Sequence, residues 1–287
     1  MKIAVFPKTC ARAGIPVMDA FIESIKDDEV MVCENHERPD ADAVVIWSVL
    51  LNLYGRKPIY DHYTKKGTKI IVIEVGGIIR NQSWRIGING INREAEFGNK
   101  NCDNSRLKKL QLDPKPWKKE RGNNIIICTQ NENSAAWPKI KMLDWCEQVL
   151  QWIRSQSPNH IILRPHPRHR LNFDHLMRKY GQMSVSFPQN TGNKDEVDFK
   201  QIIQNAHCVI NYNSNPAIES VLEGVPVYVD ESSLCWPVGN SIGGDINNPV
   251  MPDRTTWLNE ISYCEWFIDE IRKGIPWQRL RPNLTNG

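Results

Sequence analysis

Five basic side chains follow a short apolar segment near the middle of the chain. Residues 160–164 predict a buried strand, and the basic residues come at its end, among two prolines that stiffen the segment: Arg164, His166, Arg168, His169 and Arg170. Ligands of open α/β sheets bind at the carboxyl ends of strands. Guanidinium groups offer paired donors to oxyanions, and an imidazole can donate to a phosphate. The segment therefore predicts a diphosphate-like site, with a solvated basic turn as the alternative.

A second polar segment follows a strand expected at 207–211. The loop residues Asn213 and Ser214 precede a helix that starts at Pro216, and Gly224 ends that helix. Free backbone N–H groups and the helix dipole favour phosphate at such a position. Glu219 lies one turn into the helix, where it can face a pair of ribose hydroxyls. The alternative is an ordinary helix cap with a carboxylate in a salt bridge.

The third candidate is Glu74, at the end of a buried strand and just before Gly76 and Gly77. The two glycines allow the backbone to come close to a ligand, and residues 84–92 add further glycines and amide side chains. A positioned carboxylate can take the proton of an attacking hydroxyl, so Glu74 is the candidate general base. A structural salt bridge at the strand end is equally compatible with the sequence. Asp61 and His62 form the second candidate for the base.

A basic stretch lies within the polar segment 99–122, which lacks helical or strand periodicity and contains two prolines. Cations can contact DNA phosphates and an aromatic ring can stack on a base. A solvated linker is the more common explanation of such a stretch. The candidate DNA-binding residues are Lys108, Lys109, Lys115, Trp117, Lys118 and Lys119.

Alternating strand and helix patterns along the chain position these residues and predict an α/β fold with mostly parallel sheets. The basic stretch separates two halves, so we expect two Rossmann-like domains facing a cleft. The expected boundaries are 1–120 for an acceptor-binding domain, 121–255 for a donor-binding domain and 256–287 for a C-terminal segment. We expect a helix over 136–154, and a long helix over 256–273 that packs back across the domains.

Composition excludes several functional classes. The 287 residues carry a net charge of +3, which alone does not indicate nucleic-acid binding, and no apolar run could span a membrane. The eight cysteines include no C-x-x-C pair, which suits core cysteines of a cytoplasmic protein. No Asp-x-Asp pair follows a strand end, and no dinucleotide, Walker or zinc-hydrolase motif is present. We therefore expect no metal and no cofactor.

The two ligand-binding segments resemble those of GT-B-fold glycosyltransferases. Arg164-Pro165-His166-Pro167 and the helix that carries Glu219 are similar to elements of capsule and teichoic-acid transferases. The resemblance covers roughly residues 124–230. It implies a nucleotide-sugar donor, for example a UDP-sugar, with Glu219 on the ribose. The residues that it places on the diphosphate are Arg164, His166, Arg168, Asn213 and Ser214.

The first half resembles bacteriophage transferases that glycosylate hydroxymethylated pyrimidines in DNA. The resemblance rests on residues 74–80, 84–92 and 266–277. It implies a monomeric, metal-independent hexosyltransferase in the cytoplasm of an infected cell, with double-stranded DNA as acceptor and the 5-hydroxymethylpyrimidine flipped out of the duplex. The alternatives are a transferase acting on a surface polysaccharide or lipid-linked glycan, a nucleotide-sugar epimerase, and a non-catalytic binder of nucleotide sugars.

Overall fold

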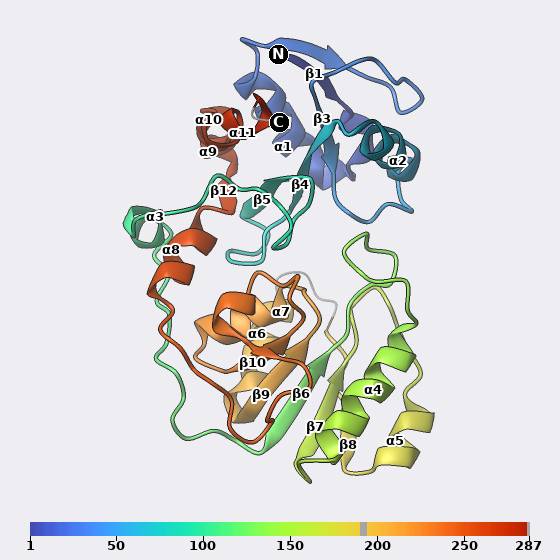
Figure 1. The fold of residues 1–287 in the computed structure, drawn as a ribbon, viewed down its shortest axis with the longest axis vertical. Coiled ribbons are helices and arrows are strands. Elements are labelled where there is room, and N and C mark those ends of the chain that lie inside the picture. The colour runs from blue at the N-terminus through green and yellow to red at the C-terminus, as the bar shows by residue number, and fades with distance from the viewer. Residues whose placement is uncertain (190–193, 286–287) are drawn as a thin grey trace. The chain divides into compact units, whose positions relative to one another are not determined.

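A computed structural model describes residues 1–189 and 194–285. The chain forms two compact units, each with its own six-stranded sheet (Figure 1). Unit 1 contains Met1–Leu110, Asn133–Ala136 and the segment from Leu258 onward, whereas unit 2 contains Gln111–Glu132 and Trp137–Trp257. The C-terminal segment is thus part of unit 1. The chain first changes units at Leu110, ten residues before the boundary expected from the sequence (120 − 110).

The sheet of unit 1 is parallel at its centre and antiparallel at one edge, with the strand order β12-β5-β4-β3-β1-β2. β4 pairs with β5, and β5 with β12, in antiparallel fashion. The fully buried sequence of β3 accounts for its central position, since strands covered on both faces are apolar throughout. The strands are β1 (Lys2–Val5), β2 (Glu29–Val32), β3 (Ala43–Trp47), β4 (Lys69–Val75), β5 (Ser83–Ile88) and β12 (Glu265–Phe267).

Helices cover both faces of this sheet. Alternate residues of each strand point to opposite sides, and apolar residues on both sides need to be buried. Val45 and Ile71 pack on the face covered by α1 and the C-terminal helices, whereas Val44 and Ile70 pack on the face covered by α2. In Figure 1, α9 and α10 lie beside α1, and the contacts between α1 and α9 confirm it. The helices are α1 (Ile15–Ser24), α2 (Arg56–Lys66), α3 (Ser105–Lys109), α9 (Ile268–Arg272), α10 (Ile275–Leu280) and α11 (Pro282–Thr285).

The sheet of unit 2 is parallel throughout, with the order β11-β10-β9-β6-β7-β8. Its strands are β6 (Asn124–Cys128), β7 (His160–Arg164), β8 (Met183–Val185), β9 (Ala206–Asn211), β10 (Val227–Val229) and β11 (Asn240–Ser241). The helices are α4 (Met142–Arg154), α5 (Asp174–Tyr180), α6 (Lys194–Ile202) and α7 (Pro216–Leu222), and α8 (Thr255–Ser262) leads back to unit 1. None of the described helices has the length and apolarity needed to cross a bilayer. Both sheets confirm the expected Rossmann-like fold class.

Two expected helices were wrong in extent. The helix expected over 256–273 is interrupted: α8 ends at Ser262, and Glu265–Phe267 pair with β5 as strand β12. This tertiary pairing overrides a helical pattern that the local sequence also allows. The helix expected from residue 136 begins only at Met142, because the chain forms loops first and Asn133–Ala136 belong to unit 1.

A buried ion pair joins α3 to the C-terminal segment of unit 1. The Arg106 guanidinium is buried, donates to the Glu270 carboxylate at 2.7 Å and lies 4.0 Å from the centroid of the Trp266 ring. Its Nε donates to the carbonyl of Ser262 at 2.6 Å, and Lys109 Nζ donates to Glu270 at 2.6 Å. These bonds give the buried carboxylate the partners that it needs away from water.

The pH dependence of stability tests this arrangement. Burial raises the pKa of the Glu270 carboxyl, but hydrogen bonds from Arg106, Lys109 and the backbone N–H of Phe267 outweigh it and hold the pKa at about 2. A pKa lowered by folding stabilises the protein above the unfolded-state value, and this stabilisation is lost as the pH falls towards the folded-state value. When the pH falls from about 5 to about 2, we expect the free energy of unfolding to decrease by on the order of 3 kcal/mol more in the wild type than in Glu270→Gln.

Urea unfolding of both proteins across this pH range measures the difference. We expect Glu270→Gln to be the less stable protein at neutral pH. The difference in free energy of unfolding between the two proteins should become smaller as the pH falls. Parallel curves for the two proteins would show that Glu270 contributes no such stabilisation.

Candidate functional site

The carboxyl edge of the sheet in unit 2 gathers polar groups from three neighbouring strands. Thr129 and Gln130 follow β6, the strand between β7 and β9. Thr129 Oγ1 accepts the backbone N–H of His166 at 3.1 Å, and Gln130 Oε1 accepts the backbone N–H of Asn213 at 3.3 Å. We call this group, completed by Ser214, the donor edge. Sequence reasoning missed Thr129 and Gln130, although they directly follow a strand that it predicted.

Arg164, expected on the diphosphate, is directed into the protein instead. Only 6% of the residue is exposed. Its Nη2 donates to Asp198 Oδ2 at 2.7 Å, its Nη1 donates to Ser186 Oγ at 3.2 Å, and its guanidinium lies 5.5 Å from the ring centroid of Phe199. Asp198 therefore neutralises the charge, and Arg164 joins β7 to α6 behind the donor edge. Arg164 can support a ligand site through this contact without touching the ligand.

His166 and Arg168 lie farther out on the same loop. His166 Nδ1 accepts the backbone N–H of Arg168 at 3.1 Å, so in the neutral ring the proton is on Nε2. The ring can therefore donate from Nε2 to an oxyanion. The side chain of Arg168 is exposed and can supply a positive charge beside it. Of the three basic residues that the resemblance places on the diphosphate, these two are partly or fully exposed, whereas Arg164 is buried.

The loop after β9 completes the donor edge. Asn211 is fully buried, and its Nδ2 donates to Ser214 Oγ at 2.6 Å while its Oδ1 accepts the Ser214 backbone N–H at 2.8 Å. Asn213 Nδ2 donates to Ser232 Oγ at 2.9 Å. These bonds restrain the loop, and a restrained loop loses less entropy when a ligand binds.

Glu219, the candidate for the ribose, lies on α7 close to the end of β6. Burial raises the pKa of the Cys128 thiol to about 12, while the charge of Arg164 opposes this rise and that of Glu219 adds to it. Both charged groups thus act on the thiol at the last residue of β6. Glu219 therefore lies in the region of unit 2 where β6 ends.

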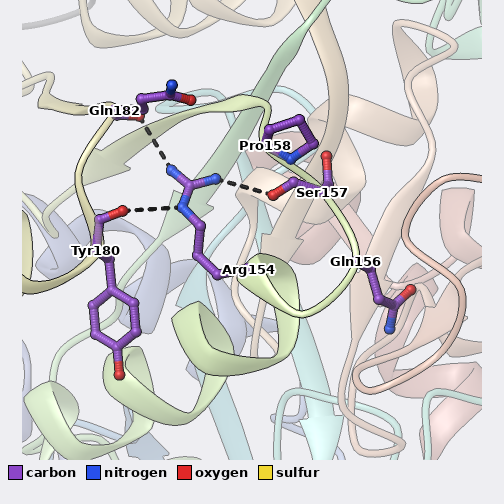
Figure 2. Close-up of a pocket in the computed structure, with 6 residues that line it drawn as sticks. All are labelled: Arg154, Gln156, Ser157, Pro158, Tyr180 and Gln182. Atoms are coloured by element: carbon purple, nitrogen blue, oxygen red, sulfur yellow. Dashed lines mark hydrogen bonds between the residues drawn. The ribbon is translucent and has the colours of Figure 1, made fainter.

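A hollow of about 480 Å³ lies elsewhere in unit 2 (Figure 2). Its walls include Arg154, Ser157, Tyr180 and Gln182, which flank the amino ends of β7 and β8 rather than the carboxyl edge. As Figure 2 shows, the Arg154 guanidinium donates to backbone carbonyls of the surrounding loops, among them that of Tyr180 at 3.2 Å. Arg154 closes the end of α4, and we assign no ligand to this hollow.

In unit 1, Glu74 lies at the carboxyl edge of the sheet, at the next-to-last residue of β4. Its Oε2 accepts a hydrogen bond from Ser48 Oγ at 2.6 Å, and its Oε1 accepts the backbone N–H of Val75 at 2.9 Å. Ser48 follows β3, the strand next to β4. Arg56 is buried behind these residues and donates to the backbone carbonyls of Thr9 at 2.7 Å and Leu50 at 2.8 Å. Neither Ser48 nor Arg56 belongs to a motif that sequence reasoning identified.

The glycines after Glu74 have a different role from the one expected. The backbone N–H groups of Gly77 and Ile78 donate to the carboxylate of Glu265 at 2.7 and 2.9 Å. Glu265 is 1% exposed and also accepts from Arg85 Nη2 at 2.7 Å. A Cβ atom on Gly76 would lie 2.6 Å from the backbone carbonyl oxygen of Ser83. Glycine is needed here because the protein's own side chains approach the backbone.

Asp61 and His62, the second candidate for the base, lie on α2 away from Glu74. Asp61 is exposed and pairs with Lys57 at 2.5 Å, one turn earlier in the helix. His62 packs edge-on against Tyr63. Lys66 of the same helix lowers the pKa of Asp40, which precedes β3 at the amino edge of the sheet, and His62 adds only the smallest effect. The structure does not bring this pair to the carboxyl edge that carries Glu74.

Four of the six candidate DNA-binding residues contact other parts of their own unit. Trp117 Nε1 donates to the carbonyl of Pro252 at 2.7 Å, and Lys118 Nζ donates to the carbonyls of Ile203 and Gln204 at 3.1 and 3.0 Å. Lys109 bonds to Glu270, as described above, and Lys115 pairs with Asp113. Lys108 and Lys119 are exposed. Among residues 1–189 and 194–285, no three His, Cys, Asp or Glu side chains gather as metal ligands would.

The sequence matches no protein-family model and no curated protein sequence. Two solved structures share the fold across nearly the whole chain. KpsC β-Kdo 2,7 transferase of Thermosulfurimonas dismutans is 14% identical, with 97% of this chain and 100% of that chain covered and a TM-score of 0.54. The β-Kdo 2,4 transferase of KpsC from the same organism is 12% identical, with coverage of 95% and 98% and a TM-score of 0.53. The likeness confirms the expected GT-B-type fold.

Replacing Gly76 by alanine tests the packing around Glu265. The added methyl group would overlap the Ser83 backbone and the Glu265 carboxylate, so the loop after β4 would have to move. We expect Gly76→Ala to lower the free energy of unfolding by about 2–3 kcal/mol. Gly67→Ala is the control, since nothing lies within 4 Å of its Cβ position and only its positive φ is strained. Urea unfolding that finds Gly76→Ala no less stable than this control would contradict the packing described.

Proposed function

We propose that the protein is a glycosyltransferase that moves a sugar from a nucleotide-activated donor to an acceptor hydroxyl. The donor edge is the observation that carries the proposal. It combines the backbone and side-chain groups of three strand ends with two basic residues of the loop after β7, the partly exposed His166 and the exposed Arg168. This site lies at the edge where α/β sheets bind ligands, in a fold that glycosyltransferases use.

In the proposed reaction, the donor edge stabilises negative charge on the departing nucleotide phosphate. His166 Nε2 and the Arg168 guanidinium donate to phosphate oxygens, while Asn213 and Ser214 line the site. Glu219 accepts hydrogen bonds from the ribose hydroxyls. Because protein cations meet the phosphate charge in this scheme, we expect transfer to persist in the presence of EDTA.

Glu74 is the proposed general base. Each of its carboxylate oxygens accepts one hydrogen bond within unit 1, and a carboxylate can accept about four. Acceptor capacity therefore remains for a substrate hydroxyl. As the new glycosidic bond forms, Glu74 takes the proton of that hydroxyl.

For the acceptor, we propose a glycan hydroxyl. Two observations support a glycan: four of the six candidate DNA-binding residues already have partners in their own unit, and the two fold relatives are described as Kdo transferases. The alternative acceptor is the 5-hydroxymethylpyrimidine of duplex DNA, which the sequence favours. Exposed Lys108 and Lys119 support this alternative.

A transfer assay with a panel of nucleotide sugars, including UDP-sugars and an activated Kdo donor, tests the proposal. The acceptors are oligosaccharides and duplexes that carry cytosine, 5-hydroxymethylcytosine or 5-hydroxymethyluracil, and mass spectrometry identifies the product. A glycosylated oligosaccharide is the expected result. A sugar gained only by a hydroxymethylated base would move the acceptor to DNA. The absence of both transfer and donor hydrolysis with every donor would overturn the proposed function.

Donor binding separates the roles of the residues in unit 2. We expect His166→Ala to weaken binding of the active donor at least 10-fold, because a charge-assisted hydrogen bond to phosphate is lost. Glu219→Gln should weaken it by a similar factor, whereas Glu74→Gln should leave it unchanged and abolish transfer. Calorimetric titration measures the affinities. Unchanged affinity in both His166→Ala and Glu219→Gln would place the donor elsewhere.

A further inference from the structure

We infer that Ser48 is a positioning residue for the proposed base, holding the Glu74 carboxylate in the orientation that proton transfer requires. The inference rests on the proposed function and extends it, since Ser48 belongs to none of the motifs that indicated glycosyl transfer. The observation behind it is the 2.6 Å hydrogen bond between Ser48 Oγ and Glu74 Oε2. The two residues are far apart in sequence but lie at the carboxyl ends of the adjacent strands β3 and β4.

The backbone of Ser48 is held in an unusual conformation. Its φ is 66°, a left-handed value that costs a non-glycine residue energy. Its N–H donates to the carbonyl of Ile73 at 2.8 Å, so the residue continues the pairing of β3 with β4. Because of this turn, the Ser48 hydroxyl is within hydrogen-bond distance of Glu74 at the end of the neighbouring strand.

Two hydrogen bonds fix the orientation of the Ser48 hydroxyl group. Its oxygen accepts the backbone N–H of Leu50 at 3.1 Å, and its single proton is donated to Glu74. A hydroxyl anchored in this way can restrain the carboxylate, because it is itself restrained by the backbone. Without it, Glu74 would keep only the bond from the adjacent N–H of Val75 and could rotate away from the acceptor.

The charge of Arg56 also attracts the Glu74 carboxylate. Only 2% of Arg56 is exposed, and its guanidinium donates to the Thr9 and Leu50 carbonyls. Burial lowers the pKa of Arg56, while the charge of Glu74 opposes this effect by favouring the charged guanidinium. The attraction between the two groups is reciprocal. Ser48, which follows β3, and Arg56, the first residue of α2, thus both act on the Glu74 carboxylate.

Ser48→Gly separates a positioning role from a structural one. Glycine adopts a φ of 66° without strain and keeps the backbone N–H, and this relief offsets its entropic cost, so the variant should fold with a Tm close to that of the wild type. The matched control is Asn101→Gly, at another non-glycine residue of unit 1 with positive φ, 56°, which is exposed and belongs to no proposed site. For each protein, we would measure transfer kinetics with the active donor and acceptor, donor affinity by calorimetry and Tm.

We expect Ser48→Gly to lower kcat by about 10-fold or more, the loss typical of a hydrogen bond to a charged group. Donor affinity should match that of the control, because the donor edge lies in unit 2 and both substitutions lie in unit 1. The Tm should also match that of the control, because both variants place glycine at a residue with positive φ. Wild-type kcat in Ser48→Gly, together with inactive Glu74→Gln, would overturn the role of Ser48 and leave the proposed function intact. If the wild type transfers no sugar, both the proposed function and the role of Ser48 are overturned. If Glu74→Gln keeps full activity, Glu74 is not the base and Ser48 does not position it.

Discussion

The buried carboxylate of Glu265 holds together the parts of unit 1 on which the Glu74 edge depends. It accepts hydrogen bonds from Arg85, Ser83 and the backbone N–H groups that follow β4, all from 2.7 to 2.9 Å. Burying an isolated charge costs a large desolvation energy. Removing one of these partners would therefore leave the buried Glu265 carboxylate without full compensation of its charge. The same carboxylate fixes β12 beside β5 and the loop beside Glu74. The C-terminal segment is therefore a structural requirement of the candidate base.

The donor edge shows that two basic residues of one motif can have different physical roles. Arg164 ends β7 and is turned into the protein, where Asp198 neutralises it. His166 comes only two residues later, but it lies on the loop beyond the sheet, where it is partly exposed. The strand thus supplies an internal anchor, and the loop supplies the proposed contact with phosphate. A substitution at either position could reduce donor binding, although for different reasons.

Most strands and both sheets could be predicted from the sequence, because strands such as β3 and β6 are apolar on both faces. The carboxyl-edge positions of Glu74, His166 and Ser214 follow from the same pattern. Strand β12 could not be predicted, because its short sequence forms a strand only through pairing with β5. The roles of Gly76 and Arg164 were equally hidden. Their partners, Glu265 and Asp198, are distant in sequence, and no local pattern encodes such contacts.

The split of unit 1 in the chain has a consequence for synthesis. On the ribosome, residues 1–110 emerge first, but β12 and the helices that cover α1 emerge only after all strands of unit 2. Unit 2 can therefore complete its sheet while β5 is still an unpaired edge, and unpaired edges are prone to pair with other chains. A chain truncated within α8 would contain every strand of the parallel sheet in unit 2, but its sheet in unit 1 would lack β12 and keep an open, aggregation-prone edge.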